Sequence, residues 1–473
     1  PGIAFQGYTV WLELEGTENG NPFSWQSSTS PDILVVEEAP QLSITSIIVP
    51  QSVTAGIQPP WDARMVLQNN GEASVEIGVD PASTRLSISI AGSGDVTGEY
   101  AFTTPESLDR SGDLVLPGGQ VDTLTFLVTG TGTTTGTAII NGIVGATDIN
   151  SGAVINDDTY TGGGSFMAVQ TPADPVIIAA SAGRDTVTSG QSTPWTLSVE
   201  VENRGQAGLT LEPDSTMLFA DYGLIVPVPP SSFVEGGISL PGGQVRSLEF
   251  DITPTPEIPG GYDLLVDVQA GFTEDNRNEY TEYDTRSAPG EGVQVRVQAP
   301  AELQVASLVC AAPNSPRVNT AQTVPFAVEL RNNGEACAGD VVVSLAGDGG
   351  STIPGGPLSV SRLCGQGTVI DTFRVDASSI AGQENFTVQI ESATDLNSGQ
   401  MELFSVAPPQ DDSETVSIED PGDLLVETVV PSQGRVNAGQ TVDWMLRVDV
   451  RNAGGAPVEL ETPSAGDIAF RRE

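Results

Sequence analysis

Two acidic segments of the sequence have the residue types and spacing with which a calcium loop begins. They read DINSG, with Asp148 and Asn150, and DLNSG, with Asp395 and Asn397. Oxygen ligands at alternate positions suit Ca²⁺, but the glycine of the standard loop comes one residue later than the glycines here. We therefore expect a hairpin turn at each segment, with calcium as the alternative, and no other cofactor.

A denser group of carboxylates lies near an expected domain end. Bridging cations could stiffen a joint there, but acids on a surface are mostly solvated side by side. We expect the solvated arrangement for this group, which consists of Glu274, Asp275, Glu279, Glu282 and Asp284.

The composition argues against most kinds of catalysis. The chain has no histidine, and all 18 of its basic residues are arginine. The usual general bases, Schiff-base nucleophiles and imidazole zinc ligands are therefore absent. A carboxylate pair of the glycosidase type stays open, because some of the 62 acids must lie close together. We expect no enzymatic activity.

The net charge of −44 limits the partners of the chain. Such a surface repels nucleic acid phosphates and anionic membranes. No apolar run approaches the eighteen or so residues of a membrane span. The first residue is Pro1, so we expect a processed product or part of a longer chain.

A short polar segment recurs four times along the chain. It reads NNGEA, NRGQA, NNGEA and NAGGA, and its glycines are 134, 129 and 120 residues apart (Gly71, Gly205, Gly334 and Gly454). A second marker gives a similar period of 130, 126 and 121 residues (Thr17, Thr147, Thr273 and Thr394). Two independent markers with the same spacing indicate repeated domains.

The residues before each recurring glycine alternate between apolar and polar. An aromatic residue lies ten positions before three of the glycines and eight before the fourth (Trp61, Trp195, Trp444 and Phe326). From Trp195 to Val201 every second residue is apolar. A period of two predicts a half-buried strand, and the closing N-x-G predicts a turn with positive φ.

Evenly spaced strands with turn signals and no helical periodicity indicate an all-β fold. We predict tandem immunoglobulin-like antiparallel β-sandwiches in a linear array. Their boundaries are placed at proline-bearing junctions, whose shortness predicts semi-stiff joints. The expected units are a C-terminal part at 1–40, three whole repeats at 41–174, 175–300 and 301–409, and an N-terminal part at 410–473.

All three cysteines lie in the third repeat. Cys337 follows the second expected strand and Cys364 precedes the strand that should run antiparallel to it, so the two fall at one pole. Cys310 ends the first strand, at the other pole. We predict a Cys337–Cys364 disulfide with Cys310 unpaired. The alternative is three buried thiols.

The segments 187–211 and 436–460 resemble the opening of the bacterial cell-adhesion-related CARDB repeat. Both contain a G-Q pair, an alternating strand and N-x-G-x-A. The later L-x-x-G and G-Y of that family are matched at Leu240–Gly243, Gly7–Tyr8 and Gly261–Tyr262, whereas the third repeat departs from it at Ala321, Phe326 and Asn385–Phe386. The resemblance implies extracellular, multi-repeat surface proteins of bacteria or archaea, without catalytic residues.

These observations predict a non-catalytic structural protein, a repeat segment of an extracellular filament or cell-surface stalk. Its partners would be neighbouring repeats or further copies of the same chain. The ends match only parts of a repeat, which fits either a segment of a longer chain or head-to-tail completion between subunits. The alternative function is an adhesin that binds a glycan or protein at the cell surface through repeat loops or a separate tip domain.

Overall fold

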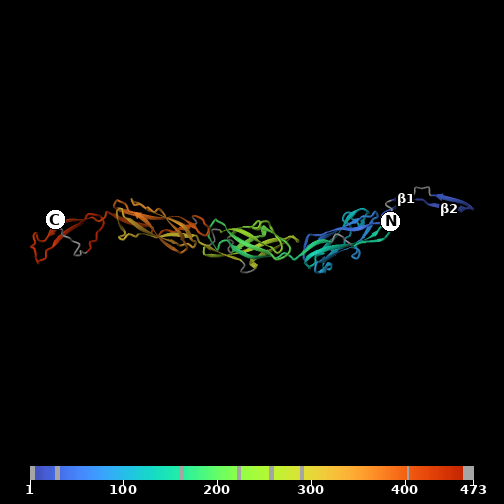
Figure 1. Ribbon diagram of the computed structural model, residues 1–473, viewed down its shortest axis with the longest axis horizontal. Coiled ribbons are helices and arrows are strands. Elements are labelled where there is room, and N and C mark those ends of the chain that lie inside the picture. Colours follow the sequence, from blue (N-terminus) through green and yellow to red (C-terminus); the bar gives the residue numbers. More distant parts are fainter. Residues whose placement is uncertain are drawn as a thin grey trace.

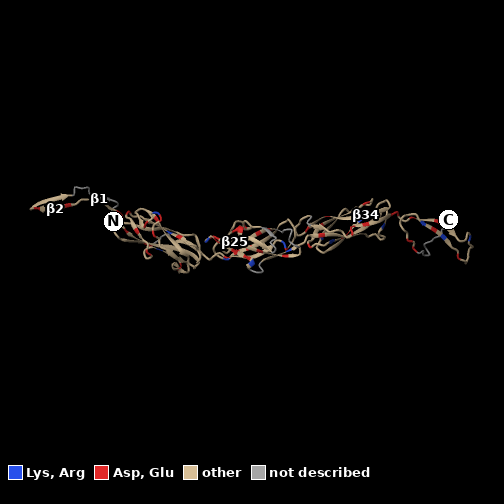
Figure 2. Cartoon of the chain, turned by 180° about the vertical axis from the view of Figure 1, so that it is seen from behind, with Lys and Arg blue, Asp and Glu red and all other residues tan. Residues whose placement is uncertain are grey.

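The computed structural model describes residues 6–26, 32–158, 164–220, 225–254, 260–287, 292–401 and 404–461. Its regular structure is almost entirely strand, so the predicted all-β fold is confirmed. The described parts follow one another along one long axis (Figure 1). Acidic side chains are spread over this whole length rather than gathered at one end (Figure 2).

The first hydrophobic core lies between Leu42 and Val169. One of its sheets has the order β11-β13-β7-β5, and the other has β10-β9-β14-β16-β6 with β8, β12 and β15 beside it. We call this unit the first sandwich. Its strands are β5 (Leu42–Ile48), β6 (Ser52–Thr54), β7 (Trp61–Asn69), β8 (Val75–Gly78), β9 (Arg85–Ile90), β10 (Gly94–Asp95), β11 (Ala101–Thr103), β12 (Val115–Leu116), β13 (Val121–Gly130), β14 (Gly136–Asp148), β15 (Val154–Asp157) and β16 (Ser165–Gln170), with the short 3-10 helix η1 (Thr97–Glu99).

The second core lies between Ile177 and Val297 and has the same plan. Its sheets have the orders β17-β19-β24-β22 and β18-β27-β25-β20-β23, with β21 and β26 paired to β25. This second sandwich contains β17 (Pro175–Ala182), β18 (Thr186–Thr188), β19 (Trp195–Asn203), β20 (Leu209–Leu211), β21 (Met217–Ala220), β22 (Ile225–Val228), β23 (Ser239–Leu240), β24 (Val245–Pro254), β25 (Tyr262–Glu274), β26 (Glu279–Asp284) and β27 (Val293–Gln298), with η2 (Pro213–Ser215) and η4 (Thr285–Ser287).

The third core lies between Ala301 and Ile418. Its sheets have the orders β33-β30-β28-β35 and β29-β36-β34-β31-β32. This third sandwich contains β28 (Ala301–Cys310), β29 (Arg317–Asn319), β30 (Thr323–Asn332), β31 (Ala338–Gly347), β32 (Leu358–Leu363), β33 (Thr368–Asp376), β34 (Gly382–Asp395), β35 (Phe404–Val406) and β36 (Ser413–Glu419).

The predicted boundary between residues 409 and 410 is wrong. Strand β36 pairs with β34 over Gly382–Thr387, and its Val416 and Ile418 belong to the third core. The proline-rich segment before β36 is therefore a loop between two strands of one sandwich. The chain leaves the third sandwich only after Glu419.

Strand pairs outside these cores occupy both ends of the described chain. They are β1 (Gln6–Val10) with β4 (Asp32–Val36), β2 (Glu13–Glu18) with β3 (Asn21–Gln26), and β37 (Leu424–Pro431) with β38 (Leu446–Asn452). Apolar side chains of these pairs, such as Trp25 and Val426, are exposed. No helix among the described residues has the length and apolar character needed to cross a membrane.

The alternating segments form an inner strand of the four-stranded sheet in each sandwich, namely β7, β19 and β30. In β19 the side chains of Trp195, Leu197, Val199 and Val201 are buried, and the residues between them face outward. A period of two places every second side chain on the core face of a strand. The short strands β6, β18 and β29 each pair in parallel with the last strand of their sandwich. In each sandwich the C-terminal ends of the short strand and of its parallel partner, the last strand, thus lie together at one pole.

The expectation of positive φ at the N-x-G glycines is also wrong. The left-handed glycines of the structure do not include Gly71, Gly205, Gly334 or Gly454. A Cβ at Gly205 would lie 2.0 Å from the carbonyl oxygen of Pro172, in the linker that enters the second sandwich. The other three glycines meet the oxygens of Ala39, Pro300 and Pro421 in the same way. Glycine is needed there because two backbones touch.

We expect Gly205→Ala to destabilise the second sandwich by about 1–3 kcal/mol, since the linker must move to admit the methyl group. Differential scanning calorimetry of the whole chain would show one unfolding transition shifted to lower temperature. Gly355→Ala is the matched control, because a Cβ there meets nothing within 4 Å and its φ is not left-handed. Equal effects of the two substitutions would contradict the close-approach argument.

Candidate functional site

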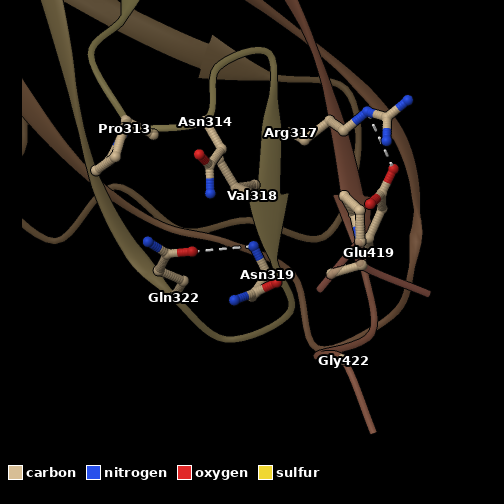
Figure 3. A pocket seen from close by; sticks show the side chains of 11 residues that line it. Pro313, Asn314, Arg317, Val318, Asn319, Gln322, Glu419 and Gly422 are labelled. Atoms are coloured by element: carbon tan, nitrogen blue, oxygen red, sulfur yellow. Dashed lines mark hydrogen bonds and ion pairs between the residues drawn. The ribbon is translucent and has the colours of Figure 1, made fainter. Parts of the chain in front are cut away.

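A pocket lies where the third sandwich meets the linker to β37 (Figure 3). Its charged lining consists of Arg317 and Glu419, which approach to 3.7 Å. No group of three or more Cys, Asp or Glu side chains among the described residues is arranged to hold a metal ion. The recurring polar contacts of the structure lie instead at the junctions between successive units.

A buried asparagine holds the linker that enters each sandwich. Asn203 Oδ1 accepts hydrogen bonds from the backbone N–H groups of Asp174 (3.2 Å) and Gly205 (3.1 Å). Its Nδ2 donates to the carbonyl oxygens of Ala207 (2.8 Å) and Leu240 (3.2 Å). One side chain therefore joins the linker, the N-x-G-x-A turn and the end of β23. We call it the clamp asparagine.

The same bonds recur at the other entry linkers. Asn69 and Asn332, like Asn203, are fully buried. Each accepts a hydrogen bond from a backbone N–H at or just before the first strand of its sandwich (Gln41 or Glu302) and donates to its own turn and to the carbonyl oxygen of Leu116 or Leu363. Asn452 bonds Asp423 N–H and Ala456 O in the last pair of strands. Buried amides are satisfied in this way because an unmade hydrogen bond costs about 1–3 kcal/mol.

The residue that follows the first three turn glycines also binds the linker through its side chain. Gln206 Oε1 accepts from Thr171 N–H at 3.1 Å. Glu72 and Glu335 accept in the same way from Glu38 N–H (3.0 Å) and Ala299 N–H (2.9 Å). Each linker is thus fixed to the sandwich that it enters.

The junction between the first and second sandwiches is closed by the turn after β25. Glu274, fully buried, accepts a hydrogen bond from Thr54 Oγ1 at 2.5 Å. Asn276 Nδ2 donates to Gln170 Oε1 (2.9 Å) and Thr54 Oγ1 (3.2 Å), and its Oδ1 accepts from Ser52 Oγ (2.7 Å). A turn of one sandwich therefore fits onto the pole of the preceding sandwich.

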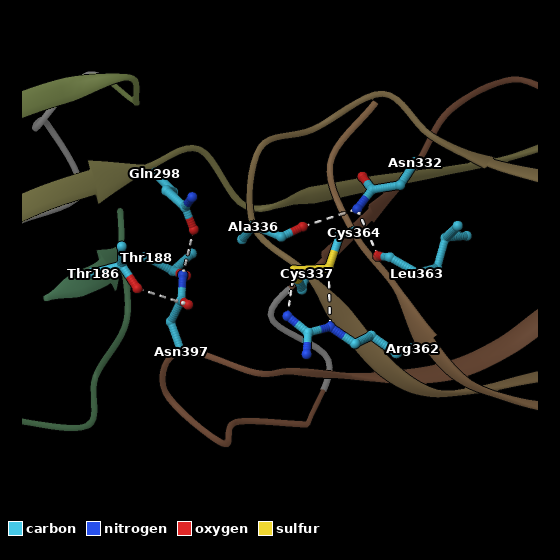
Figure 4. Close-up of a disulfide and its surroundings, with 10 residues drawn as sticks. All are labelled: Thr186, Thr188, Gln298, Asn332, Ala336, Cys337, Arg362, Leu363, Cys364 and Asn397. Carbon is cyan, nitrogen blue, oxygen red and sulfur yellow. Dashed lines mark hydrogen bonds between the residues drawn. A yellow bond between two sulfur atoms is a disulfide. The ribbon is translucent and has the colours of Figure 1, made fainter. Parts of the chain in front are cut away.

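The junction between the second and third sandwiches repeats this contact (Figure 4). Asp395, nearly fully buried, accepts from Thr188 Oγ1 at 2.8 Å. Asn397 Nδ2 donates to Gln298 Oε1 (2.8 Å) and Thr188 Oγ1 (2.9 Å), and Thr186 Oγ1 donates to Asn397 Oδ1 (3.2 Å). We call the carboxylate and asparagine the key, and the threonine and glutamine that meet them the socket.

The first sandwich presents the same kind of key to the strand pair before it. Asn150 Nδ2 donates to Glu37 Oε2 at 2.8 Å, just after β4. Asp148 accepts from Ser151 Oγ and from the N–H of Asn150 within its own turn. These bonds hold the pKa of Asp148 below its ordinary value.

Three of the four calcium candidates, Asn150, Asp395 and Asn397, therefore contact the preceding unit, whereas the hydrogen bonds of Asp148 lie within its own turn. The two segments lie at hairpin turns: β14 pairs with β15 across the first, and Thr394 bridges to Met401 across the second. The oxygens of Asp148 and Asp395 accept hydrogen bonds from their own turns. Calcium at Asp148, Asn150, Asp395 and Asn397 stays an untested alternative.

The sequence reasoning missed the socket residues and the role of Glu274. Glu274 was expected in a solvated acidic surface, but it is buried against Thr54 and paired with Arg277 at 2.8 Å. A signal was present in the sequence. A Val-Thr pair precedes the turn that leads to β7, at Val53–Thr54, and the turn that leads to β19, at Val187–Thr188. That signal does not say what the threonine contacts.

Two opposing effects determine the pKa of Glu274 at the first junction. Burial on its own raises the pKa of Glu274, but hydrogen bonds from Arg277, Thr54 and Ala173 N–H outweigh it and hold the pKa below the ordinary 4.5. The same pairing raises the pKa of Arg277. Both side chains are charged at neutral pH.

The disulfide lies directly beside the clamp of the third sandwich (Figure 4). Cys337 and Cys364 are bonded, and Arg362 Nε donates to Cys364 Sγ at 3.0 Å. Asn332 Nδ2 donates to the carbonyl oxygens of Ala336 and Leu363, the residues just before the two cysteines. The covalent bond therefore joins the same two segments as the clamp asparagine. Cys310 is buried and unpaired, and burial raises the pKa of its thiol.

Comparisons with known proteins yield no family. No family model matches the chain, and no curated protein is similar in sequence. Among solved structures it is similar to E. coli alpha-2-macroglobulin (9% identity, 91% of this chain and 30% of that chain, TM-score 0.17) and to the major pilin subunit of Bacillus cereus (9%, 78% and 94%, TM-score 0.19). It is also similar to red sea bream transglutaminase (10%, 59% and 37%, TM-score 0.19). Likenesses this weak carry no conclusion, so the CARDB resemblance stays a prediction.

We expect acid to loosen the first junction. The pKa of Glu274 is lower in the folded protein than the ordinary 4.5. Its stabilisation of the folded junction is therefore complete above pH 4.5 and is lost as the pH falls through the pKa of the folded protein. Small-angle X-ray scattering between pH 7 and pH 3 would show the first and second sandwiches becoming mutually mobile. Glu274→Gln should already be loosened at pH 7 and respond less to acid. A pH response of the variant equal to that of the unchanged chain would exclude Glu274 as its source.

We expect thiol chemistry to report the cysteine pairing. Iodoacetamide should label no residue in the native chain, one in urea, and all three after urea and reductant, counted by mass spectrometry. The pair spans a separation of 27 residues, so reduction should destabilise the third sandwich by roughly 3–4 kcal/mol through the entropy of the unfolded chain. Three labelled thiols in urea without reductant would show that the disulfide is absent.

Proposed function

We propose that this chain is a non-catalytic structural protein, a tandem-repeat segment of an extracellular filament or cell-surface stalk. The observation that carries the proposal is the recurrence of one junction. The same asparagine amide, one per turn, reaches a glutamate or glutamine at the end of the preceding unit, at Asn150, Asn276 and Asn397.

The energetics of the junction suit this role. Hydrogen bonds are directional, so several of them at one turn fix the orientation of one sandwich relative to the next. The linker has little freedom of its own, because the clamp asparagine and the adjacent Glu or Gln bind its backbone. The units are therefore held at defined angles as well as at defined spacing.

The composition and the disulfide support an extracellular place. A surface with a net charge of −44 keeps a long chain soluble and prevents side-by-side collapse. A disulfide at Cys337–Cys364 persists in an oxidising compartment. The partners that we propose are further repeats of the same kind, in the same or a neighbouring chain.

The test is the stiffness of one junction. Negative-stain electron microscopy of the whole chain should show rods with a narrow distribution of bend angles at the two junctions between the sandwiches. The double variant Thr188→Ala, Asn397→Ala should widen the distribution at the second junction and leave the first unchanged. Thr196→Ala, on an exposed position of β19, is the matched control. Equally broad angle distributions in the unchanged chain and the double variant would contradict the proposal that these hydrogen bonds hold the sandwiches at defined angles.

A further inference from the structure

Three of the junctions define where a fourth socket must lie. The acceptor of the asparagine amide is Glu37, Gln170 or Gln298. In each case the acceptor lies two residues before the residue whose carbonyl oxygen approaches the turn glycine of the next unit. Those residues are Ala39, Pro172 and Pro300. Pro421 makes this contact with Gly454, so the fourth acceptor is Glu419.

Glu419 has the surroundings of a socket residue. It ends β36 and is paired in parallel with Asn319 of β29, as Gln170 is paired with Thr54 and Gln298 with Thr188. Its Oε1 approaches Arg317 and accepts a hydrogen bond from Ser417 Oγ at 3.3 Å. The side chain is 19% exposed. These two contacts orient the Glu419 side chain without a docked turn.

The second carboxylate oxygen of Glu419 lacks a donor. Oε2 is buried and has no hydrogen-bond partner among the described residues. A buried acceptor that has lost water and gained no donor costs free energy, so native structures rarely leave one unpaired. At the three other junctions an asparagine Nδ2 supplies the donor to the equivalent residue.

The pocket next to Glu419 has room and chemistry for a key (Figure 3). Its volume of about 190 Å³ is more than ten times the roughly 10–15 Å³ that a site for one water needs, so a side-chain amide fits. Asn319 is exposed at the place of the socket threonine, and its amide can donate to a carboxylate. Arg317 offsets the charge of a second carboxylate beside Glu419.

We propose that this pocket is a docking site for a hairpin turn that carries a carboxylate and, two residues later, an asparagine. The turn belongs to a sandwich that includes β37 and β38. At Gln170 and Gln298 the key comes from the sandwich whose clamp asparagine holds the intervening linker, and at Glu419 that clamp is Asn452 of β38. The asparagine of the key donates to Glu419 Oε2, and its carboxylate accepts from Asn319. The inference rests on the proposed role as a repeat segment.

The test uses the whole chain and a key taken from its own sequence. The probe is a fluorescent cyclic peptide that contains Ala393–Gln400, and binding is measured by fluorescence anisotropy at physiological salt. We expect saturable binding to the unchanged chain and to Glu419→Gln, which keeps an acceptor as Gln170 and Gln298 do. Glu419→Ala should weaken binding at least tenfold, whereas Glu302→Ala, an exposed acid at the opposite pole, should leave it unchanged.

A second peptide separates recognition from general stickiness. The same peptide with Asn397→Ala should bind at least tenfold more weakly, because it lacks the donor. No binding of the first peptide up to millimolar concentration, equal binding to Glu419→Ala, or equal binding of both peptides would overturn the docking site. Any of these outcomes combined with stiff junctions in the electron micrographs would remove this inference and leave the proposed function standing. Peptide binding as expected, combined with a broad distribution of bend angles at the junctions, would remove the proposed function and leave the docking site standing.

Discussion

The structure depends on one buried asparagine in each repeat. Its amide has two donors and one acceptor oxygen with two lone pairs, and in Asn203 all of them are used. Because the partners come from the linker, the turn and a distant strand, none of the three segments can move without unmaking a buried hydrogen bond. The adjacent glycine lets the linker approach within contact distance of the turn. A linker held in this way has the geometry of a folded segment rather than of a tether.

Fixing the linker makes a small polar contact sufficient at the junction. Loop-closure and rotational entropy oppose any contact between two independent domains. At these junctions most of that entropy is already lost when the linker is bound, so a single turn with a carboxylate and an asparagine can set the relative orientation. The contacts described at these joints are hydrogen bonds between polar side chains, on a chain whose net charge is −44.

The sequence could predict what is local and periodic, and it failed where distant segments meet. The alternation from Trp195 to Val201 predicted β19, and the period of the turn glycines predicted the repeats. The role of Gly205 was misjudged because a positive φ and a close backbone approach both select glycine. The boundary at 409 was misplaced because a proline-rich loop between two strands of one sandwich looks like a linker. Nothing local marks Thr188 as the partner of Asp395, 207 residues away.

The two junctions reach the same geometry with different charge arrangements. At the first, Glu274 is neutralised by Arg277 from its own turn, and at the second, Asp395 is held by Thr188 and by Ser398 of its own turn. What the repeats keep is the hydrogen-bonding pattern and not the ion pair. The contact is also heterologous, because the key is at one pole of a sandwich and the socket at the other. A heterologous contact that does not close on itself propagates in one direction, and the extended course of the chain (Figure 1) is the outcome of that rule for units joined in series.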